Sequence, residues 1–174
     1  MIIILEGPDL VGKTTLAGLL SEALECPVVH PWMDLSHAAA SAMTLGKTLP
    51  ALLSVSGVNV IFDRLHFSEY VYAQIHGRDH TYLPELFREW EVPQTYLIIL
   101  TATEEIFEER FRKRGDDMQG LADILATKRL YSTLPLVLPS SIKVLEIDTS
   151  YLEPTTLVEQ ICAWLKESKV SYHV

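Results

Sequence analysis

A glycine-rich stretch near the start of the chain most constrains its fold. Residues Gly7 to Thr14 fit the phosphate-loop pattern G-x-x-x-x-G-K-[ST] without a mismatch. Before the stretch, Ile2 to Leu5 form an unbroken apolar run, which is typical of a strand buried on both faces of a parallel sheet. After it, leucine and alanine recur at helical spacing until Pro27. The sequence therefore predicts a strand, a glycine-rich loop and a helix, in the order that the phosphate-loop motif requires.

The residue types of this loop suit the phosphates of a nucleotide. Gly7 and Gly12 can adopt backbone conformations closed to residues with a Cβ atom, so successive N–H groups can surround phosphate oxygens. The helix that follows directs the positive end of its dipole at the same anion. Lys13 can reach the β- and γ-phosphates, and the Thr14 hydroxyl can ligate Mg²⁺. We therefore expect a nucleotide-phosphate site at this loop.

Apolar runs and helical patterns alternate along the rest of the chain. Further strands are expected at 28–30, 58–62, 95–100 and 142–147, and further helices at 36–42, 49–55, 67–76, 83–90, 103–114, 121–133 and 157–166. Gly46 and Pro50 are expected to separate the helical patterns at 36–42 and 49–55. The alternation predicts one domain over residues 1–174, an α/β fold with a doubly wound parallel sheet and helices on both faces. Its ligand should bind at the carboxyl ends of the strands.

The composition narrows the class of protein. The 174 residues are 48% hydrophobic and 21% charged, as in an ordinary globular protein, and the apolar runs are too short to cross a bilayer. Cys26 and Cys162 have neither metal-ligand spacing nor a redox motif. The start of the chain is taken up by the motif, so no signal peptide is expected. We therefore expect a cytoplasmic protein without a membrane partner.

The charge of the chain bears on its partners. A net charge of −9 disfavours a nucleic-acid partner, which calls for a basic surface. Basic residues do gather at 110–114, and such a cluster suits a compact polyanion such as a nucleotide. A solvated helix face, paired with the glutamates at 104–109, is the alternative for these residues.

Two further candidate site residues follow the apolar run at 58–62. In a parallel sheet, Asp63 and Arg64 would lie at the same edge as the phosphate loop. The carboxylate could hold Mg²⁺ or accept a proton, and the guanidinium could bind a second phosphate through two parallel hydrogen bonds. A surface salt bridge at the strand end is the alternative.

These segments together resemble the thymidylate kinase group of nucleoside monophosphate kinases. The stretch Glu6-Gly-Pro-Asp-Leu-Val-Gly-Lys-Thr-Thr15 is similar to the group's Glu-Gly-x-Asp-Gly-x-Gly-Lys-Thr-Thr. Asp63-Arg64-Leu is similar to its Asp-Arg-Tyr, with Ser and Tyr a few residues on. Residues 110–115 resemble the arginine-rich segment that leads into the lid over ATP, and 147–149 resemble the adenine-side loop. The resemblance implies a P-loop kinase fold with a lid at about residues 110–120, which in this chain is short for the group.

The resemblance also implies a phosphate donor and a metal, namely ATP and Mg²⁺. Thr14 and Asp63 would hold the metal, Arg110 would lie against the adenine, and Arg112 and Arg114 would neutralise charge on the transferring group. The residues implied in catalysis are Lys13, Asp63, Arg64, Arg112 and Arg114. Those implied in ATP binding are Gly7, Pro8, Leu10, Val11, Gly12, Lys13, Thr14, Thr15, Arg110, Asp148 and Thr149.

The acceptor side is expected to be a small-molecule nucleotide or nucleoside site. Arg64 would hold an acceptor phosphate, and Asp9 would contact the acceptor's sugar 3′-hydroxyl or a neighbouring arginine. His66 follows Arg64 closely enough to point into this site, and the rings of Trp32 and Tyr72 could stack on a base. Packing in the core is the alternative for each aromatic residue.

The chain departs from the group's pattern at three places. It reads Val29-His30-Pro31-Trp32 where the group has Arg-Glu-Pro, Ala73 where a glutamine that helps read thymine is expected, and Leu10 in place of a loop glycine. The residues expected to bind phosphate are kept, while these departures leave open which base the acceptor carries.

The sequence thus predicts ATP-dependent, Mg²⁺-requiring phosphoryl transfer to a (deoxy)nucleoside monophosphate. One alternative is a (deoxy)nucleoside kinase, in which Asp63 would act as general base on a 5′-hydroxyl. Another is a kinase of a hydroxyl on a modified nucleotide or DNA base. A GTPase is disfavoured because no Asn-Lys-x-Asp stretch exists, and a motor ATPase because Asp63 is followed by Arg64 instead of a second acid. A monomer and a homodimer are both left open.

Overall fold

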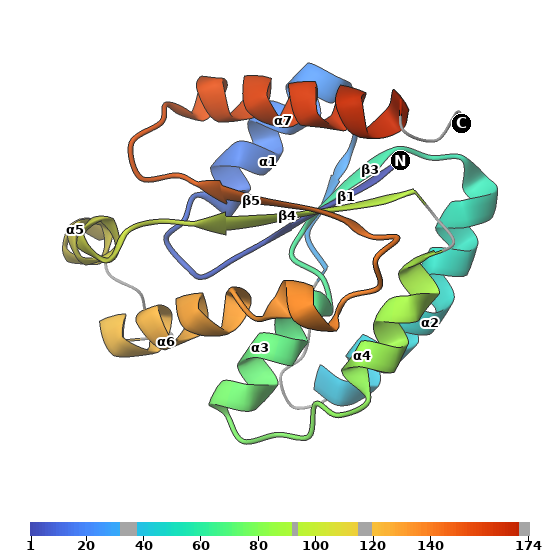
Figure 1. Cartoon of the computed structure of the whole chain (residues 1–174), viewed down its shortest axis with the longest axis horizontal. Coiled ribbons are helices and arrows are strands. Elements are labelled where there is room, and N and C mark those ends of the chain that lie inside the picture. Colours follow the sequence, from blue (N-terminus) through green and yellow to red (C-terminus); the bar gives the residue numbers. More distant parts are fainter. Residues whose placement is uncertain (32–37, 92–93, 115–119, 171–174) are drawn as a thin grey trace.

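Strands and helices alternate along the chain in the computed structural model, which describes residues 1–31, 38–91, 94–114 and 120–170 (Figure 1). The strands are β1 (Ile2–Glu6), β2 (Val28–Val29), β3 (Val60–Asp63), β4 (Thr95–Thr101) and β5 (Lys143–Asp148). The α-helices are α1 (Lys13–Leu24), α2 (Ala38–Ser56), α3 (Phe67–Ile75), α4 (Leu83–Leu86), α5 (Glu104–Arg114), α6 (Leu121–Tyr131) and α7 (Pro154–Val170). The described residues also form two 3₁₀ turns, η2 (Phe87–Glu91) and η3 (Leu134–Val137).

The five strands form one parallel sheet in the order β2-β3-β1-β4-β5. The central strand β1 pairs with β3 on one side, where Ile2 lies opposite Val60, and with β4 on the other, where Ile2 lies opposite Thr95. All five residues of β1 are buried. Such a strand is expected to be apolar on both faces, which is why Ile2 to Leu5 form a continuous apolar run and not an alternation, and Glu6 is the buried polar exception. The predicted doubly wound α/β fold is confirmed.

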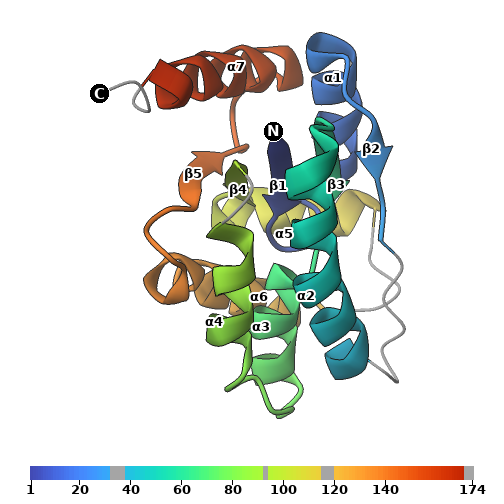
Figure 2. The same ribbon diagram turned by 90° about the vertical axis from the view of Figure 1, so that its right-hand side faces the viewer.

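Alternate residues of β1 belong to two hydrophobic cores, one on each face of the sheet. Ile3 and Leu5 contribute to the core beneath α1 and α7. Ile2 and Ile4 contribute to the core that packs against α3, α4 and η2. Figure 2 shows α1 and α7 on one side of the sheet and α2, α3 and α4 on the other.

The second helical region differs from its prediction. Instead of two helices separated at Gly46 and Pro50, α2 continues through both residues. A Cβ atom on Gly46 would lie 2.6 Å from side-chain atoms of Leu86 in α4, so this glycine marks a close approach between α2 and α4 and does not end a helix. Residues 87–91 form a 3₁₀ turn where an α-helix was expected. None of the helices within the described ranges is both long and apolar enough to span a lipid bilayer.

Candidate active site

The glycine-rich loop joins the carboxyl end of β1 to the first residue of α1, as predicted. Gly7 and Gly12 have φ angles of 139° and 88°. Gly7 must also lack a side chain, because a Cβ atom there would lie 2.3 Å from the carbonyl oxygen of Leu100 on β4. Leu10 has a φ of 68°, a left-handed conformation that accounts for the glycine usual at this place in the thymidylate kinase group. The backbone of the loop thus passes close to β4 at Gly7 and has a left-handed conformation at Leu10 and Gly12.

The Lys13 ammonium group is buried inside the loop. Its Nζ atom donates hydrogen bonds to the carbonyl oxygens of Gly7 (3.0 Å) and Pro8 (2.6 Å), and lies 3.8 Å from Asp9 Oδ1. Burial, with the nearby Arg64 guanidinium, lowers the pKa of Lys13 to about 7. An anion bound in the loop would raise this pKa again and favour the charged form of Lys13.

Thr14 and Asp63, predicted to hold a metal, are in direct contact. The Thr14 hydroxyl donates to Asp63 Oδ2 at 2.7 Å, since β3 ends beside the phosphate loop. Hydroxyl and carboxylate oxygens are the ligand types that Mg²⁺ takes. Among the described residues no three His, Cys, Asp or Glu side chains form a metal-holding group. The two oxygens therefore fit a Mg²⁺ ion completed by substrate phosphates and water, which is its usual mode of binding.

His30 is a further neighbour of Asp63 that the sequence analysis did not assign to the site. It follows β2, and its Nδ1 atom lies 3.2 Å from Asp63 Oδ2. A signal was available, because His30 is the last residue of a predicted strand of the same parallel sheet, at the edge where ligands bind.

Arg64 lies beside the phosphate loop, with Asp9 and Tyr72 around its guanidinium group. Its Nη2 atom forms an ion pair with Asp9 Oδ1, and its guanidinium carbon is 5.4 Å from the centre of the Tyr72 ring. The Tyr72 hydroxyl is 3.4 Å from Asp9 Oδ2, to which it donates. The structure thus brings three predicted acceptor residues together. Of the two contacts expected for Asp9, it shows the one with a neighbouring arginine.

Glu6 and Tyr131 also belong to this cluster, although the sequence analysis assigned them no role. Glu6 is fully buried, and its carboxylate accepts hydrogen bonds from the backbone of Leu65 and Ser68 and from the Tyr131 hydroxyl. Burial raises the pKa of Glu6 to about 7 against the opposing effect of Arg64. Glu6 could have been noticed as the charged residue that ends an apolar strand. Tyr131 offered no such signal, because it is 125 residues away along the chain.

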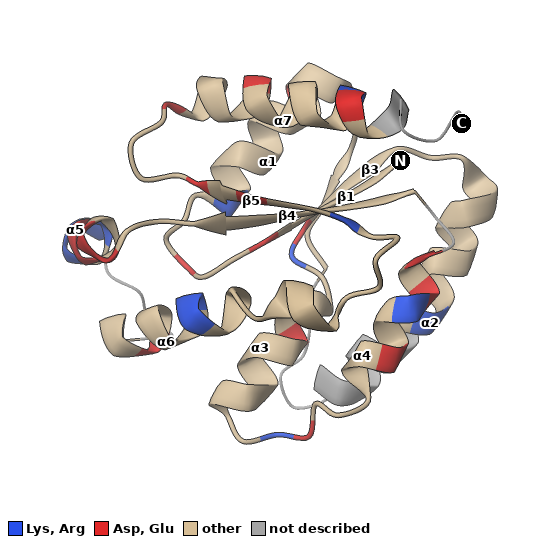
Figure 3. Ribbon diagram, in the orientation of Figure 1, with Lys and Arg blue, Asp and Glu red and all other residues tan. Residues whose placement is uncertain are grey.

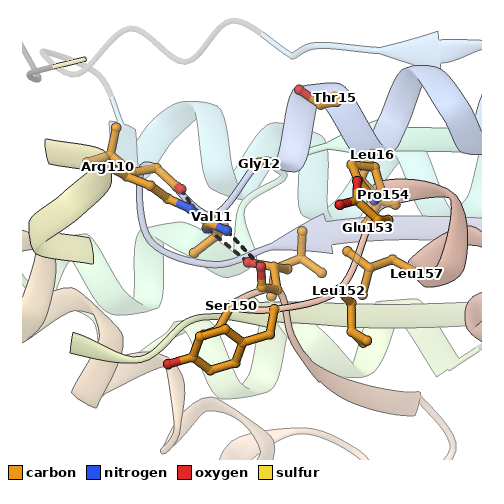
Figure 4. A pocket seen from close by; sticks show the side chains of 14 residues that line it. Val11, Gly12, Thr15, Leu16, Arg110, Ser150, Leu152, Glu153, Pro154 and Leu157 are labelled. Carbon is orange, nitrogen blue, oxygen red and sulfur yellow. Dashed lines mark hydrogen bonds between the residues drawn. The ribbon is translucent and has the colours of Figure 1, made fainter. Parts of the chain in front are cut away.

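On the other side of the phosphate loop, a cavity of about 390 Å³ lies where the adenine of ATP was expected (Figure 4). Arg110 lines this cavity: its Nη1 atom donates to Leu10 O and Thr149 Oγ1, both at 3.0 Å, and Nη2 donates to Thr149 O at 2.7 Å. The cavity is lined by Leu10, Val11, Gly12, Thr15, Leu16, Leu100, Arg110, Thr149, Ser150, Tyr151, Leu152, Glu153, Pro154 and Leu157. The lining residues from 150 to 154 were missed, although the loop after a final strand is a common ligand position in such sheets.

The expectation that His66 points into the acceptor site is wrong. The side chain is fully buried, and its ring centre lies 4.6 Å from that of Phe67, 5.7 Å from Phe87 and 5.4 Å from Trp90. Neither ring nitrogen has a hydrogen-bond partner within the described structure. Burial lowers the pKa of His66 to about 3, so the ring is neutral. Although His66 is only two residues after Arg64, its side chain points into the core and not toward the acceptor site.

Other predicted residues lie apart from the cavity or outside the described residues. Asp148 does not line the cavity, and its Oδ1 atom instead accepts a hydrogen bond from the backbone of Ser150 (2.8 Å), which shapes the loop. Arg112 and Arg114 are exposed on α5, where acidic and basic residues mix (Figure 3). Their contact with phosphates stays a prediction. Trp32 lies outside the described residues.

Two curated proteins are similar to the chain over most of its length, while no family model matches it. The SPbeta prophage-derived uncharacterized protein YorR of Bacillus subtilis (strain 168) is 31% identical over 134 residues, which are 75% of this chain and 79% of YorR. A putative adenylate kinase of Thermococcus onnurineus (strain NA1) is 28% identical over 166 residues, 95% of this chain and 84% of that protein.

Solved structures share the fold. The crystal structure of YorR protein from Bacillus subtilis, in complex with phosphorylated GDP, has a TM-score of 0.76 at 23% identity, with 100% of both chains covered. Deoxyadenosine kinase from M. mycoides, with the products dCMP and a flexible dCDP bound, has a TM-score of 0.65 at 18% identity, with 96% and 100% covered. The fold is therefore that of P-loop nucleoside kinases, and the thymidylate kinase group is not singled out within it.

Proposed function

This chain belongs to the protein family of Bacillus subtilis YorR, and we propose that it is a kinase of nucleoside monophosphates. It transfers the γ-phosphoryl group of ATP to the acceptor's phosphate group. Support comes from the kinase fold and from the similarity to a putative adenylate kinase. Both substrates are small molecules of the cytoplasm, which is where we place the enzyme.

The position of Asp9 between two cations carries this proposal. The Asp9 carboxylate lies 3.8 Å from Lys13 Nζ and is ion-paired with Arg64. Lys13 belongs to the donor-phosphate loop, so a second phosphate-binding cation stands directly beside the donor site. A protein that only hydrolyses a nucleotide needs one phosphate site, whereas transfer between two phosphorylated molecules needs two adjacent ones.

The chemistry of such a site is positioning and charge stabilisation. Lys13 and the loop N–H groups hold the donor phosphates, and Arg64 exchanges its contact with Asp9 for the acceptor phosphate. Thr14 and Asp63 hold Mg²⁺, which neutralises charge on the donor phosphates when it is bound. Arg110 and Thr149 form one wall of the adenine cavity. Arg112 and Arg114 supply further positive charge to the transferring group.

A nucleoside kinase is the second candidate, and the contact between His30 and Asp63 favours it. A nucleoside acceptor must lose the proton of its hydroxyl group, while a monophosphate is already ionised. A carboxylate with an imidazole 3.2 Å away can accept such a proton. The deoxyadenosine kinase with the same fold is named for a nucleoside acceptor.

An acceptor panel tests both candidates. The full chain is incubated with ATP, Mg²⁺ and, in turn, each nucleoside and each monophosphate, and ADP formation is measured. We expect at least one monophosphate to raise the rate well above that with ATP alone, and excess EDTA to abolish the increase. A response to nucleosides alone would favour the second candidate. ATP turnover that no acceptor changes would contradict both.

A further inference from the structure

Glu6 and Tyr131 connect the acceptor arginine to the buried centre of the sheet. We propose that both are positioning residues, which fix the Arg64 guanidinium group at the transfer site and thereby set the affinity for the acceptor. The inference rests on the proposed function, in which Arg64 contacts the acceptor phosphate.

The first connection runs through side chains. Arg64 Nη1 donates a hydrogen bond to the Tyr131 hydroxyl at 3.2 Å, and that hydroxyl donates to Glu6 Oε2 at 2.9 Å. Tyr131 is the last residue of α6 and is 1% exposed. Asp9, on the other side of the guanidinium group, has a side chain that is 30% exposed and lies on the loop. The buried pair is therefore the rigid anchor, and Asp9 is the partner that an acceptor phosphate can replace.

The second connection runs through the backbone. Arg64 has a φ of 68°, a left-handed conformation that is unfavourable for a residue with a side chain. Glu6 Oε1 accepts hydrogen bonds from the N–H groups of Leu65 (2.9 Å) and Ser68 (3.2 Å), which lie directly after this turn. His66, at the N-cap of α3, makes no side-chain cap bond, and Glu6 adds a second acceptor to the Ser68 N–H in the first turn of this helix, which also donates to the carbonyl oxygen of Leu65. One carboxylate thus holds the turn that presents Arg64 and, through Tyr131, its guanidinium group.

The location of Glu6 is hard to explain by stability alone. The four residues before it in β1 are apolar and buried, and an apolar residue at its place would avoid the desolvation of a carboxylate. All three hydrogen bonds of Glu6 lead instead to the turn or the side chain of the proposed acceptor arginine. A positioning role accounts for a buried carboxylate at the end of the central strand.

Tyr131→Phe tests the side-chain connection by removing one hydroxyl group. We expect the KM for the acceptor to rise about tenfold, as for the loss of a hydrogen bond to a charged group, with the KM for ATP changed less than twofold. Tyr82→Phe is the matched control and should change neither constant, because the Tyr82 hydroxyl has no hydrogen-bond partner among the described residues. An unchanged acceptor KM in Tyr131→Phe would overturn the inference.

A double-mutant cycle separates positioning from general destabilisation. Acceptor binding is measured by calorimetry for Arg64→Ala with and without Tyr131→Phe. We expect Tyr131→Phe to weaken binding only when Arg64 is present. An equal loss in both backgrounds would show that Tyr131 acts otherwise, and would overturn the inference.

Nuclear magnetic resonance of the Arg64 guanidinium group needs no acceptor. We expect a restrained guanidinium signal in the wild type and in Tyr82→Phe, and an averaged signal in Tyr131→Phe and in Glu6→Gln. Glu6→Gln serves if the tyrosine variant does not fold. If no acceptor is turned over, the proposed function fails, while this signal still decides the positioning of Arg64. An unchanged signal in both variants would overturn the inference even in an active enzyme.

Discussion

His66 shows how a single buried side chain couples folding to pH. In the unfolded chain its imidazole titrates near its ordinary pKa of 6.5, while in the folded protein burial lowers the pKa to about 3. Between these values the unfolded state binds a proton that the folded state excludes. The free energy of unfolding therefore loses a contribution as pH falls from 6.5 toward 3, and keeps it at higher pH.

His66→Phe should remove this sensitivity to acid, because phenylalanine fits an aromatic cluster and has no nitrogen to protonate. Each pH unit below 6.5 costs about 1.4 kcal/mol, so between pH 6.5 and 4.5 the wild type should lose about 2–3 kcal/mol more than the variant. Urea unfolding at the two pH values measures the difference. The exposed His76, changed to Gln, is the control and should follow the wild type. Equal losses in wild type and His66→Phe would contradict the prediction.

At this scale the sequence predicts residues whose roles are set by their near neighbours. Lys13 and Thr14 belong to a local motif, so the phosphate loop could be predicted. Asp63 and Arg64 come at the end of a recognisable strand, so their position beside the loop could be predicted as well. Glu6 and Tyr131 contact each other only because β1 and α6 are brought together by the fold. His66 was misassigned because its direction depends on the turn at Arg64, which the sequence does not reveal.

Glycines within helices have opposite roles in two elements. Gly18 in α1 is exposed, and a Cβ atom there would have no neighbour within 4 Å. Gly46 in α2 would place a Cβ atom 2.6 Å from Leu86. The first glycine only weakens its helix, whereas the second permits close packing.

Gly18→Ala should stabilise the protein by up to about 1 kcal/mol, since alanine has the higher helix propensity. Gly46→Ala should give less than this gain or destabilise, because Leu86 is buried and must move. Thermal and urea unfolding of the two variants, compared with the wild type, provide the measurement. A gain at Gly46 equal to that at Gly18 would show that the approach to Leu86 does not restrict this position.

The elements themselves could largely be predicted, because periodicity marks strands and helices. The failure at α2 has a physical reason. Glycine and proline both weaken an isolated helix, but packing against α3, α4 and η2 supports α2 across Gly46 and Pro50. A local pattern does not contain that support.

For the whole molecule, nucleotide binding and folding should be linked. A ligand that binds only the folded state at 100 times its Kd adds about 2.7 kcal/mol of stability. For a domain of this size that corresponds to a rise in Tm of about 5–10 °C. We expect ATP with Mg²⁺ to produce such a rise in the wild type and much less in Lys13→Ala, measured by differential scanning fluorimetry.

Lys13→Ala should remain folded, since the loop lies outside both hydrophobic cores except for Val11 and Leu10. Circular dichroism serves as the control for its fold. An equal rise in Tm in the variant would remove Lys13 from the phosphate site.

At this scale the sequence predicts the α/β class from the alternation of elements, whereas the strand order is known only from the structure.

The central place of β1 affects how the protein can lose its site. β1 is hydrogen-bonded along both edges and covered on both faces, while β2 and β5 lie at the margins of the sheet. Marginal strands can open in local fluctuations, but β1 can exchange its amide hydrogens only when the sheet is dismantled. The phosphate loop starts directly after this strand. The anchor of the loop therefore belongs to the slowest-exchanging part of the molecule, and partial opening at the margins leaves it in place.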